Sequence, residues 1–194
     1  MRKKGLDFRR KRRKKINSGV LKEIGSWAFV IAVSVFLAFV IVYTFGERTV
    51  VYGNSMEPKL YGGQQVLINR FVYVISDPDF GDVVAFLPNG NENSHYYIKR
   101  IIGTPGDTVQ IRNGYLYLNG AKLNEGDEFD KIADPGIAEN EITLGEDEYF
   151  VLGDNRNFSE DSRSGNVGVV KKRYMLGKVW FRISKDLQFM GFVR

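Results

Sequence analysis

The sequence predicts a mainly β protein, in which one N-terminal transmembrane helix is followed by a curled, barrel-like antiparallel sheet. Three observations favour this fold class. An uncharged apolar run lies near the N-terminus of the 194-residue chain, the rest consists of short apolar or alternating runs separated by Gly, Pro, Asn and Asp, and no long amphipathic helical pattern follows residue 47. The chain is also too short for two large domains besides an anchor.

The apolar run covers 24–46 and contains no charged residue over 23 positions. As a helix it would reach roughly 35 Å, enough to cross a hydrocarbon core of about 30 Å. Trp27 and Tyr43 stand near its two ends, as interfacial aromatic side chains do. A buried core helix would need a polar face for the solvent side, and a cleaved signal peptide would have an apolar region of only about 7–15 residues before a small-x-small site. The sequence therefore predicts an uncleaved transmembrane anchor.

The net charge of +5 combines two unlike parts of the chain. Residues 1–23 carry eleven Lys and Arg side chains against two acidic ones, whereas the remainder carries 17 basic and 21 acidic side chains. By the positive-inside rule the basic tail 1–23 stays in the cytoplasm, so 47–194 form the extracytoplasmic domain of a single-pass protein of the cell membrane. The tail is expected to attract anionic lipid. Because the basic charge lies in the tail and not on a face of the folded domain, no nucleic-acid partner is expected.

Cysteine is absent, and His95 is the single histidine of the sequence. These counts exclude a disulfide framework, a zinc–thiolate site and a cysteine nucleophile. Scattered carboxylates with one histidine provide no metal-ligand set, so we expect no metal and no other cofactor. A Ser-His-Asp triad would have to use His95, but its turn-rich surroundings favour a solvent-facing loop histidine.

Eight short runs after the anchor have the composition of β-strands. They are 48–52, 65–70, 82–87, 96–102, 108–112, 115–118, 149–152 and 178–183. Asn113-Gly114 lies between two of them and predicts a tight hairpin. The acidic, loop-rich stretch 119–148 indicates an insertion or flap, and 169–176 suits a short helix.

Ser55 lies in the turn-like sequence Gly53-Asn54-Ser55-Met56-Glu57-Pro58, shortly after the anchor. A serine nucleophile needs a proton acceptor, and Lys99 is the best candidate in a chain with almost no histidine. Alternation in the run 96–102 puts Lys99 and Arg100 on opposite faces, so one of these cations points to the less exposed side. Burial lowers a lysine pKa from about 10.4, and a pKa of about 7–8 would make the amine a base at neutral pH. Taken alone, Lys99 also suits an ordinary surface position, and the spacing does not decide between the two.

Four segments, taken together and in order behind an anchor, carry a family resemblance. They are the Ser55 turn, Phe80-Gly81-Asp82-Val83-Val84-Ala85-Phe86, Lys99-Arg100-Ile101-Ile102-Gly103-Thr104-Pro105-Gly106-Asp107 and Gly153-Asp154-Asn155-Arg156-Asn157-Phe158-Ser159-Glu160-Asp161-Ser162-Arg163. The set resembles the type I signal peptidases, membrane-anchored serine endopeptidases that remove signal peptides from exported proteins, and the compact body resembles their short Gram-positive-type members. The resemblance implies a catalytic domain of signal peptidase type and signal peptides of preproteins as substrates.

The resemblance also implies roles for particular residues. The family's nucleophile falls on Ser55 and its general base on Lys99. Ser159 would hydrogen-bond the Lys99 amine and orient it, and Asp161 with Arg163 would form an ion pair that holds this stretch in place. The family's second oxyanion donor comes from the position that Gly53 occupies here, so a backbone or water donor would have to replace a serine hydroxyl.

Substrate recognition is implied in the same way. The end of the signal peptide would lie extended between two strand ends, and shallow pockets would admit only small residues, giving a preference for Ala-x-Ala. The residues that fall on this groove are Val51, Tyr52, Gly53, Tyr97 and Ile98.

Other functions remain open from the sequence. A catalytically silent, membrane-anchored relative would act as a binding or assembly factor, although both Ser55 and Lys99 are present. A peptidase dedicated to one client, such as a pilin subunit, would carry the same residues. A self-cleaving Ser-Lys repressor would need a DNA-binding helix-turn-helix in place of the anchor.

One departure from the family is Phe80, which stands where an arginine is usual. This difference concerns membrane docking and not chemistry.

Overall fold

The computed structural model describes residues 18–45, 47–125, 129–184 and 190–193. The chain divides into two compact units, Met1–Val40 and Ile41–Arg194. Of the expected cytoplasmic tail 1–23, residues 1–17 lie outside the described residues, and residues 18–23 form the start of the N-terminal helix.

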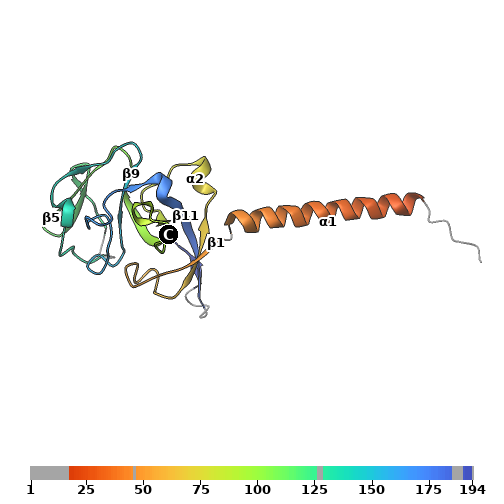
Figure 1. The fold of residues 1–194 in the computed structure, drawn as a ribbon, viewed down its shortest axis with the longest axis horizontal. Coiled ribbons are helices and arrows are strands. Elements are labelled where there is room, and N and C mark those ends of the chain that lie inside the picture. The colour runs from red at the N-terminus through yellow and green to blue at the C-terminus, as the bar shows by residue number, and fades with distance from the viewer. Residues whose placement is uncertain (1–17, 46, 126–128, 185–189, 194) are drawn as a thin grey trace, which may run out of the picture. The chain divides into compact units, whose positions relative to one another are not determined.

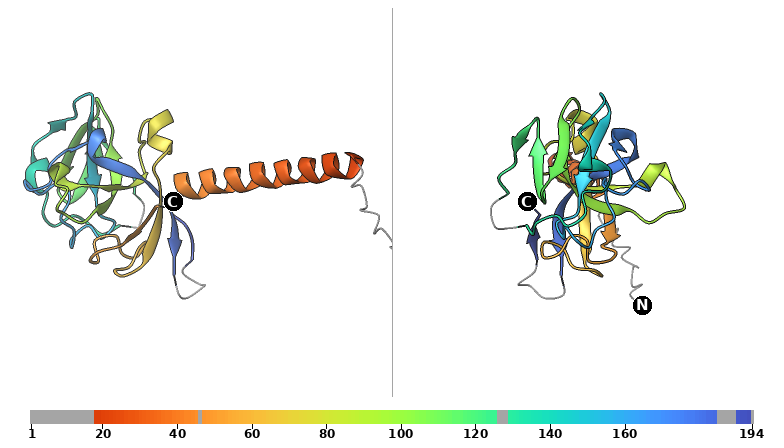
Figure 2. Two further views of the ribbon diagram at one scale, coloured as in Figure 1. Left: turned by 45° about the vertical axis from the view of Figure 1, so that its right-hand side comes forward. Right: turned by 90° about the vertical axis from the view of Figure 1, so that its left-hand side faces the viewer.

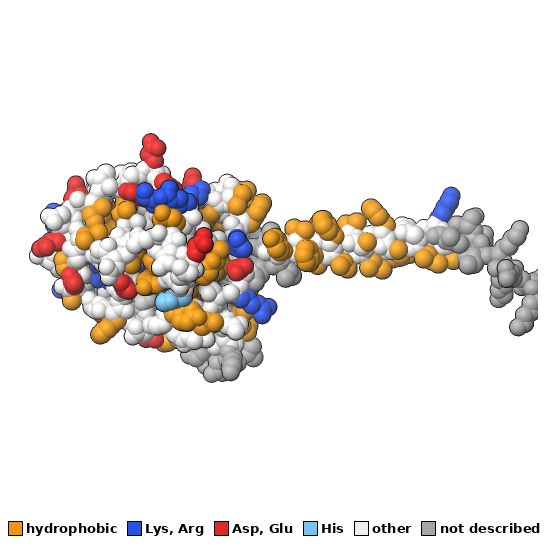
Figure 3. Space-filling view, in the orientation of Figure 1, with side chains coloured by type: hydrophobic (Ala, Val, Ile, Leu, Met, Phe, Trp, Pro, Cys, Tyr) orange, Lys and Arg blue, Asp and Glu red, His pale blue; other side chains and the backbone are white. Residues whose placement is uncertain are grey.

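The N-terminal element is the helix α1, Ser18–Phe45. It begins six residues before the predicted apolar run, and its stretch Lys22–Ile41 is long and apolar enough to cross a membrane. Exposed apolar side chains follow one another along this helix (Figure 3). A helix of this kind has no polar face with which to meet water, which is consistent with a membrane anchor.

The larger of two sheets contains eight strands within the described residues, and all of its pairings are antiparallel. Its strands are β1 Glu47–Val50, β2 Gln65–Asn69, β3 Val83–Phe86, β4 Tyr97–Gly103, β9 Glu148–Leu152, β10 Val170–Lys171, β11 Met175–Ile183 and β12 Gly191–Phe192. The order is β1-β2-β11-β3-β4-β9-β10, with β12 on β11. The sheet curls on itself as a half-barrel (Figures 1 and 2), which confirms the predicted fold class.

A second sheet has the order β7-β6-β5-β8. Its strands are β5 Thr108–Arg112, β6 Tyr115–Leu118, β7 Ala121–Lys122 and β8 Ile142–Thr143. Asn113 and Gly114 join β5 to β6 with positive φ angles of 53° and 80°, the conformation of the tight hairpin predicted there. The stretch 119–148 contributes β7, β8 and the 3₁₀ helix η2 (Gly136–Glu139), and a flap role for it stays a prediction.

The remaining helical elements are short. They are α2 Val72–Ile75, η1 Pro88–Gly90 and η3 Lys172–Tyr174. The prediction of a helix over 169–176 is wrong, because only η3 is helical there. Val170 of β10 pairs with Tyr149 of β9, and Met175 of β11 pairs with Phe86 of β3, so both ends of the segment belong to strands.

Three apolar clusters hold the domain together. One packs Met56 and Leu60, from the turn that carries Ser55, against residues of β2 and β11 such as Ile68 and Val179. Another joins the two sheets by packing side chains of β4 and β9 against β5 and β6. The third lies among β3, β4, β9 and β10. The strand that carries Lys99, β4, contributes Ile98 to the first cluster, Ile102 to the second and Ile101 to the third, so its position is fixed on several sides.

Candidate active site

Ser55 is held by a turn that is anchored in the core. Gly53 has a φ of +72°, which favours glycine, and the Glu57 N–H donates to the Asn54 carbonyl across the turn at 3.1 Å. The next residue, Met56, is completely buried. Burial of this neighbour fixes the turn, while Ser55 itself stays partly exposed at the edge of a pocket.

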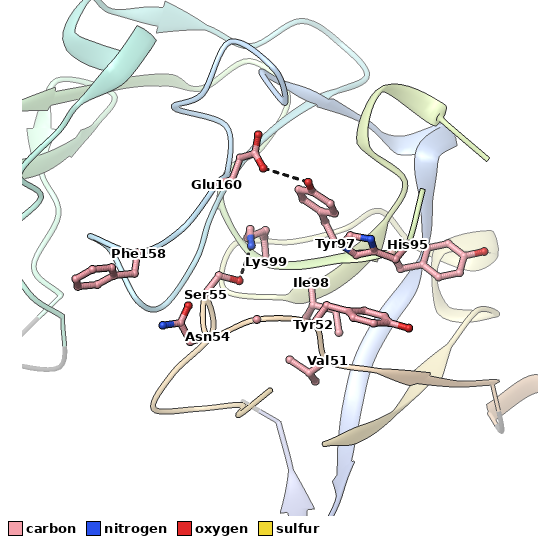
Figure 4. Close-up of a pocket in the computed structure, with 12 residues that line it drawn as sticks. Val51, Tyr52, Asn54, Ser55, His95, Tyr97, Ile98, Lys99, Phe158 and Glu160 are labelled. Carbon is pink, nitrogen blue, oxygen red and sulfur yellow. Dashed lines mark hydrogen bonds between the residues drawn. The ribbon is translucent and has the colours of Figure 1, made fainter. Parts of the chain in front are cut away.

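Lys99 approaches this serine from β4. Its side chain is directed to the less exposed side of the sheet and is only 4% exposed. The Lys99 Nζ and the Ser55 Oγ hydrogen-bond at 2.6 Å (Figure 4). Arg100, the next cation along the strand, forms a bidentate pair with Asp154, with both N···O distances 2.7 Å. As the alternation predicts, the two cations lie on opposite faces of β4. The Lys99 amine is buried beside the Ser55 hydroxyl, and the Arg100 guanidinium pairs with Asp154.

Burial dominates the electrostatics of the Lys99 amine. It lowers the pKa of Lys99 from 10.5 to about 8, because the ammonium form loses hydration inside the protein. The Asp161 and Glu160 carboxylates oppose this by raising the pKa, Arg163 lowers it further, and Asp154 raises it. At pH 7 about a tenth of the amine is therefore unprotonated and able to accept a proton, far more than for an ordinary lysine.

The third part of the site is the 153–163 loop, which follows β9. Asp161 and Arg163 form a buried ion pair, with Arg163 Nε 2.8 Å and Nη2 2.9 Å from the two carboxylate oxygens. The same carboxylate accepts the Gly153 N–H at 3.1 Å. Burial alone would raise the pKa of Asp161, but the hydrogen bonds and charge of Arg163 outweigh it and the pKa is lowered. The ion pair, together with the bond to the Gly153 N–H, therefore holds the loop in its folded form.

Ser159 does not make the hydrogen bond expected of it. Its Oγ is buried and has no hydrogen-bond partner of good geometry, so the predicted bond to the Lys99 amine is not formed. The hydroxyl does lie near enough to Asp161 to help lower the pKa of that carboxyl. The Lys99 amine instead uses its close contact with Ser55.

Gly153 and Asn155 fasten the loop to the serine turn. The backbone N–H of Asn155 donates to the Ser55 carbonyl at 3.0 Å, and its side-chain amide donates to the Asn54 carbonyl at 3.2 Å. A Cβ added at Gly153 would lie 2.2 Å from the Ser159 Oγ and 2.4 Å from the Ser55 carbonyl oxygen. Only glycine therefore allows these two segments to approach so closely.

Gly153→Ala is expected to slow peptide cleavage by more than tenfold and to lower stability by about 1–3 kcal/mol, because the methyl group pushes the Ser55 backbone away from Lys99. The measurements are kcat and a thermal melt in detergent. Gly165→Ala is the matched control, since a Cβ there meets open space. Normal kcat in Gly153→Ala would contradict the close packing.

Arg156, in the same loop, belongs to the site although nothing in the sequence predicts it. Its side chain is completely buried, donates to the Gly153 carbonyl at 2.6 Å and to Glu125 at 2.5 Å, and stacks on the Phe129 ring with 4.1 Å from Cζ to the centroid. An arginine in a polar loop gives no sequence signal of burial. The contact ties the 119–148 stretch to the backbone next to the serine turn.

A pocket of about 260 Å³ adjoins the serine and lysine. The residues Val51, Tyr52, Gly53, Tyr97 and Ile98, expected from the resemblance, line it together with Ser55 and Lys99 (Figure 4). β3 pairs with Tyr97–Arg100, and on the other edge of β4 the partner strand β9 pairs with residues from Arg100 onward. Within the described residues, no strand pairs with that other edge from Tyr97 to Lys99.

His95 stands at the rim of this pocket. It is exposed, as expected for a loop histidine, but its ring also lies 4.7 Å from the Tyr52 ring and 5.3 Å from the Tyr97 ring, between centroids. These aromatic contacts join the two sides of the pocket and have no signal in the sequence. Within the part of the chain that the structure describes, no three His, Asp or Glu side chains are grouped to hold a metal ion.

The chain is similar in sequence to known proteins over most of its length. Residues 24–184 match the family described as signal peptidase, peptidase S26. Signal peptidase I P of Bacillus subtilis subsp. natto is 34% identical over 179 residues, which cover 88% of this chain and 91% of that relative. Signal peptidase IB of Staphylococcus aureus (strain COL) is 36% identical over 180 residues, covering 83% and 90%. The crystal structure of a signal peptidase I from Enterococcus faecalis V583 has 32% identity and a TM-score of 0.40, covering 54% of this chain and 98% of that one.

The chain therefore belongs to the signal peptidase family, peptidase S26. It is a signal peptidase of the type I class to which these Gram-positive relatives belong.

Proposed function

We propose that the protein cleaves signal peptides from exported preproteins after small residues, with Ser55 as the nucleophile and Lys99 as the general base. The observation that carries this proposal is the 2.6 Å contact between the Ser55 Oγ and a Lys99 amine that is only 4% exposed. A buried, partly unprotonated amine next to a hydroxyl is the arrangement that activates a serine without histidine.

The reaction proceeds in two halves. The neutral Lys99 amine takes the Ser55 hydroxyl proton as Oγ attacks the scissile carbonyl carbon, and a tetrahedral oxyanion forms. When it collapses, Lys99 gives the proton to the departing amine of the mature protein, and the signal peptide stays on Ser55 as an ester. A water molecule then attacks the ester while Lys99 takes its proton. The same proton returns to Ser55 Oγ as the signal peptide leaves.

The developing oxyanion needs hydrogen-bond donors. The backbone N–H of Ser55 is the donor that the turn itself supplies, and such a donor is worth about 3 kcal/mol of transition-state stabilisation. Gly53 has no side chain to contribute, so the second donor is assigned to a backbone group or to water. This difference from relatives with a hydroxyl at the position does not affect the serine and lysine themselves.

The open edge of β4 at Tyr97–Lys99 supports strand addition as the binding mode. An extended peptide beside this edge would satisfy its backbone groups there, and alternate side chains would point into the pocket. Val51 and Ile98 are buried apolar side chains that line the pocket together with Ser55. Small residues such as alanine at the −1 and −3 positions fit this space.

The helix α1 is assigned as a membrane anchor, with the basic tail 1–23 in the cytoplasm and the β domain outside. Support comes from its apolar length and from the position of the Lys and Arg cluster before it. The same cluster would hold anionic lipid at the inner surface. A catalytic domain next to the bilayer meets signal peptides as they leave the membrane.

The proposed function is tested with the full chain in detergent and a preprotein whose residue at −1 is alanine. Cleavage at this junction, located by mass spectrometry of the new N-terminus, is the expected result. A matched preprotein with leucine at −1 should be cut at least tenfold more slowly, because the larger side chain would meet the buried side chains of Val51 and Ile98 that line the pocket. Absence of cleavage, or equal cleavage of both, overturns the activity or the specificity respectively.

A further inference from the structure

Glu160 lines the pocket, but the proposed reaction of Ser55 and Lys99 gives it no role. It is an exposed residue of the 153–163 loop and lines the same pocket as Ser55 and Lys99. One carboxylate oxygen accepts the Tyr97 hydroxyl at 3.1 Å, and the other accepts the Asn166 side-chain amide at 3.4 Å. An exposed glutamate usually samples many rotamers, but here both oxygens have partners, so the charge is held in one place.

The position of the Glu160 carboxylate depends on its hydrogen bond with Tyr97. Tyr97 lies two residues before Lys99 on β4, so both side chains stand on the same face of the strand. The Lys99 Nζ is 5.5 Å from the centroid of the Tyr97 ring, and the ring itself packs beside Phe86. Figure 4 shows Glu160 bonded to the far end of this ring, above the Lys99–Ser55 contact.

Four charged side chains act on the Lys99 amine: Asp161, Glu160, Arg163 and Asp154. Two of the three carboxylates are neutralised by guanidinium groups, since Asp161 pairs with Arg163 and Asp154 pairs with Arg100. The hydrogen-bond partners of Glu160 are a hydroxyl and an amide, and no cation within the described residues forms an ion pair with it. Its negative charge is therefore the least compensated one that faces the amine.

We propose that Glu160, held in place by Tyr97, is a positioning residue that keeps an unpaired negative charge near the Lys99 amine and sets the pH range in which Lys99 exchanges a proton with Ser55. This inference rests on the proposed function of Lys99 as the base. The charge matters after Lys99 has taken the proton, because Lys99 must hold that proton until it passes to the leaving amine. An ammonium made too acidic by burial would release the proton early.

The test is the pH dependence of kcat/KM for a peptide substrate without groups that titrate between pH 6 and 10. Wild-type activity should rise with pH as the Lys99 ammonium, with a pKa of about 8, loses its proton. In Glu160→Gln the ammonium loses a favourable charge while the Tyr97 hydroxyl keeps an acceptor. The rising limb should therefore move to lower pH, by on the order of half a unit. Glu141→Gln, at an exposed position outside the pocket, should leave the limb in place.

Tyr97→Phe removes the hydrogen bond to Glu160 and keeps the Glu160 charge. The ring stays over Lys99, but the carboxylate loses its hydroxyl partner and can turn to solvent, so the limb should move in the same direction by a smaller amount. The double variant should match Glu160→Gln alone, because Tyr97 acts through Glu160. An unmoved limb in Glu160→Gln, a move to higher pH, or an additive shift in the double variant overturns the inference.

A second readout does not depend on cleavage. Competitive labelling of the wild-type chain and of Glu160→Gln with trace acetic anhydride, read by mass spectrometry at each pH, titrates Lys99 directly. If no peptide is cut but the titration shifts, the proposed function is wrong and the assignment of Glu160 stands. If peptides are cut and the titration is unchanged, the assignment of Glu160 is wrong.

Discussion

Lys99→Met is expected to lower kcat for peptide cleavage by about a thousandfold, the range that a positioned general base contributes. Methionine has a similar length and suits a buried position, so the change removes the amine without leaving a cavity or a stranded charge. Lys99 is 4% exposed and lies among apolar residues of β3 and β4, so the variant should keep the wild-type circular dichroism and melt at the same or a higher temperature.

The matched control is Lys171→Met on β10, a partly exposed lysine outside the pocket, which should cleave normally. Ser55→Ala should lose as much activity as Lys99→Met, and the double variant should lose no more than either, because the two groups act as one unit. A Lys99→Met protein that retains a tenth or more of the wild-type kcat would remove the amine from the mechanism.

Asp161→Ala should destabilise the folded chain by about 3–5 kcal/mol, the loss found when one partner of a buried ion pair is removed. The Asp161 carboxylate is completely buried and Arg163 nearly so, so the variant leaves a guanidinium without its counter-ion. It also removes the acceptor of the Gly153 N–H, next to the Ser55 carbonyl. Urea unfolding in detergent, followed by circular dichroism, measures the first effect, and kcat under native conditions measures the second.

The pH dependence of stability follows from the same pair. Because the folded pKa of Asp161 lies below its unfolded value of about 3.9, its stabilisation is present at neutral pH and is lost as the pH falls through the folded pKa. Asp161→Ala should therefore show a smaller decrease of unfolding free energy on acidification than the wild type. The control Asp130→Ala, at an exposed position, should behave as the wild type in both measurements. Equal stability of Asp161→Ala and wild type at pH 7 would contradict a structural role for the pair.

The fold was predictable from the sequence where local rules decide it. Asn113-Gly114 indicated a hairpin because its backbone angles favour these residues, and alternation in 96–102 indicated a strand with two differently placed cations. The error at 169–176 has a non-local cause, since Val170 and Met175 pair with strands far away in sequence. The strand order is equally non-local: β11 separates β2 from β3, and no local pattern specifies this.

The candidate site was predictable only as far as the resemblance covers it. Ser55 and Lys99 lie 44 positions apart, and their contact depends on pairing in the sheet, so spacing alone did not decide the role of the lysine. The bond expected from Ser159 is absent although its motif is present. The resemblance assigns no role to Arg156 or Glu160, and their contacts with Gly153 and Tyr97 exist only after the loop has folded.

The place of β11 has a consequence for how the enzyme comes into being. In the larger sheet, β1 and β2 flank the turn with the serine, β4 carries the lysine, and β11 joins these two halves although it comes near the end of the chain. A nascent polypeptide that has emerged only as far as β9 contains Ser55 and Lys99 but lacks β11, the strand that pairs with both β2 and β3. We therefore expect the contact between these two side chains to form only when almost the whole chain has been synthesised.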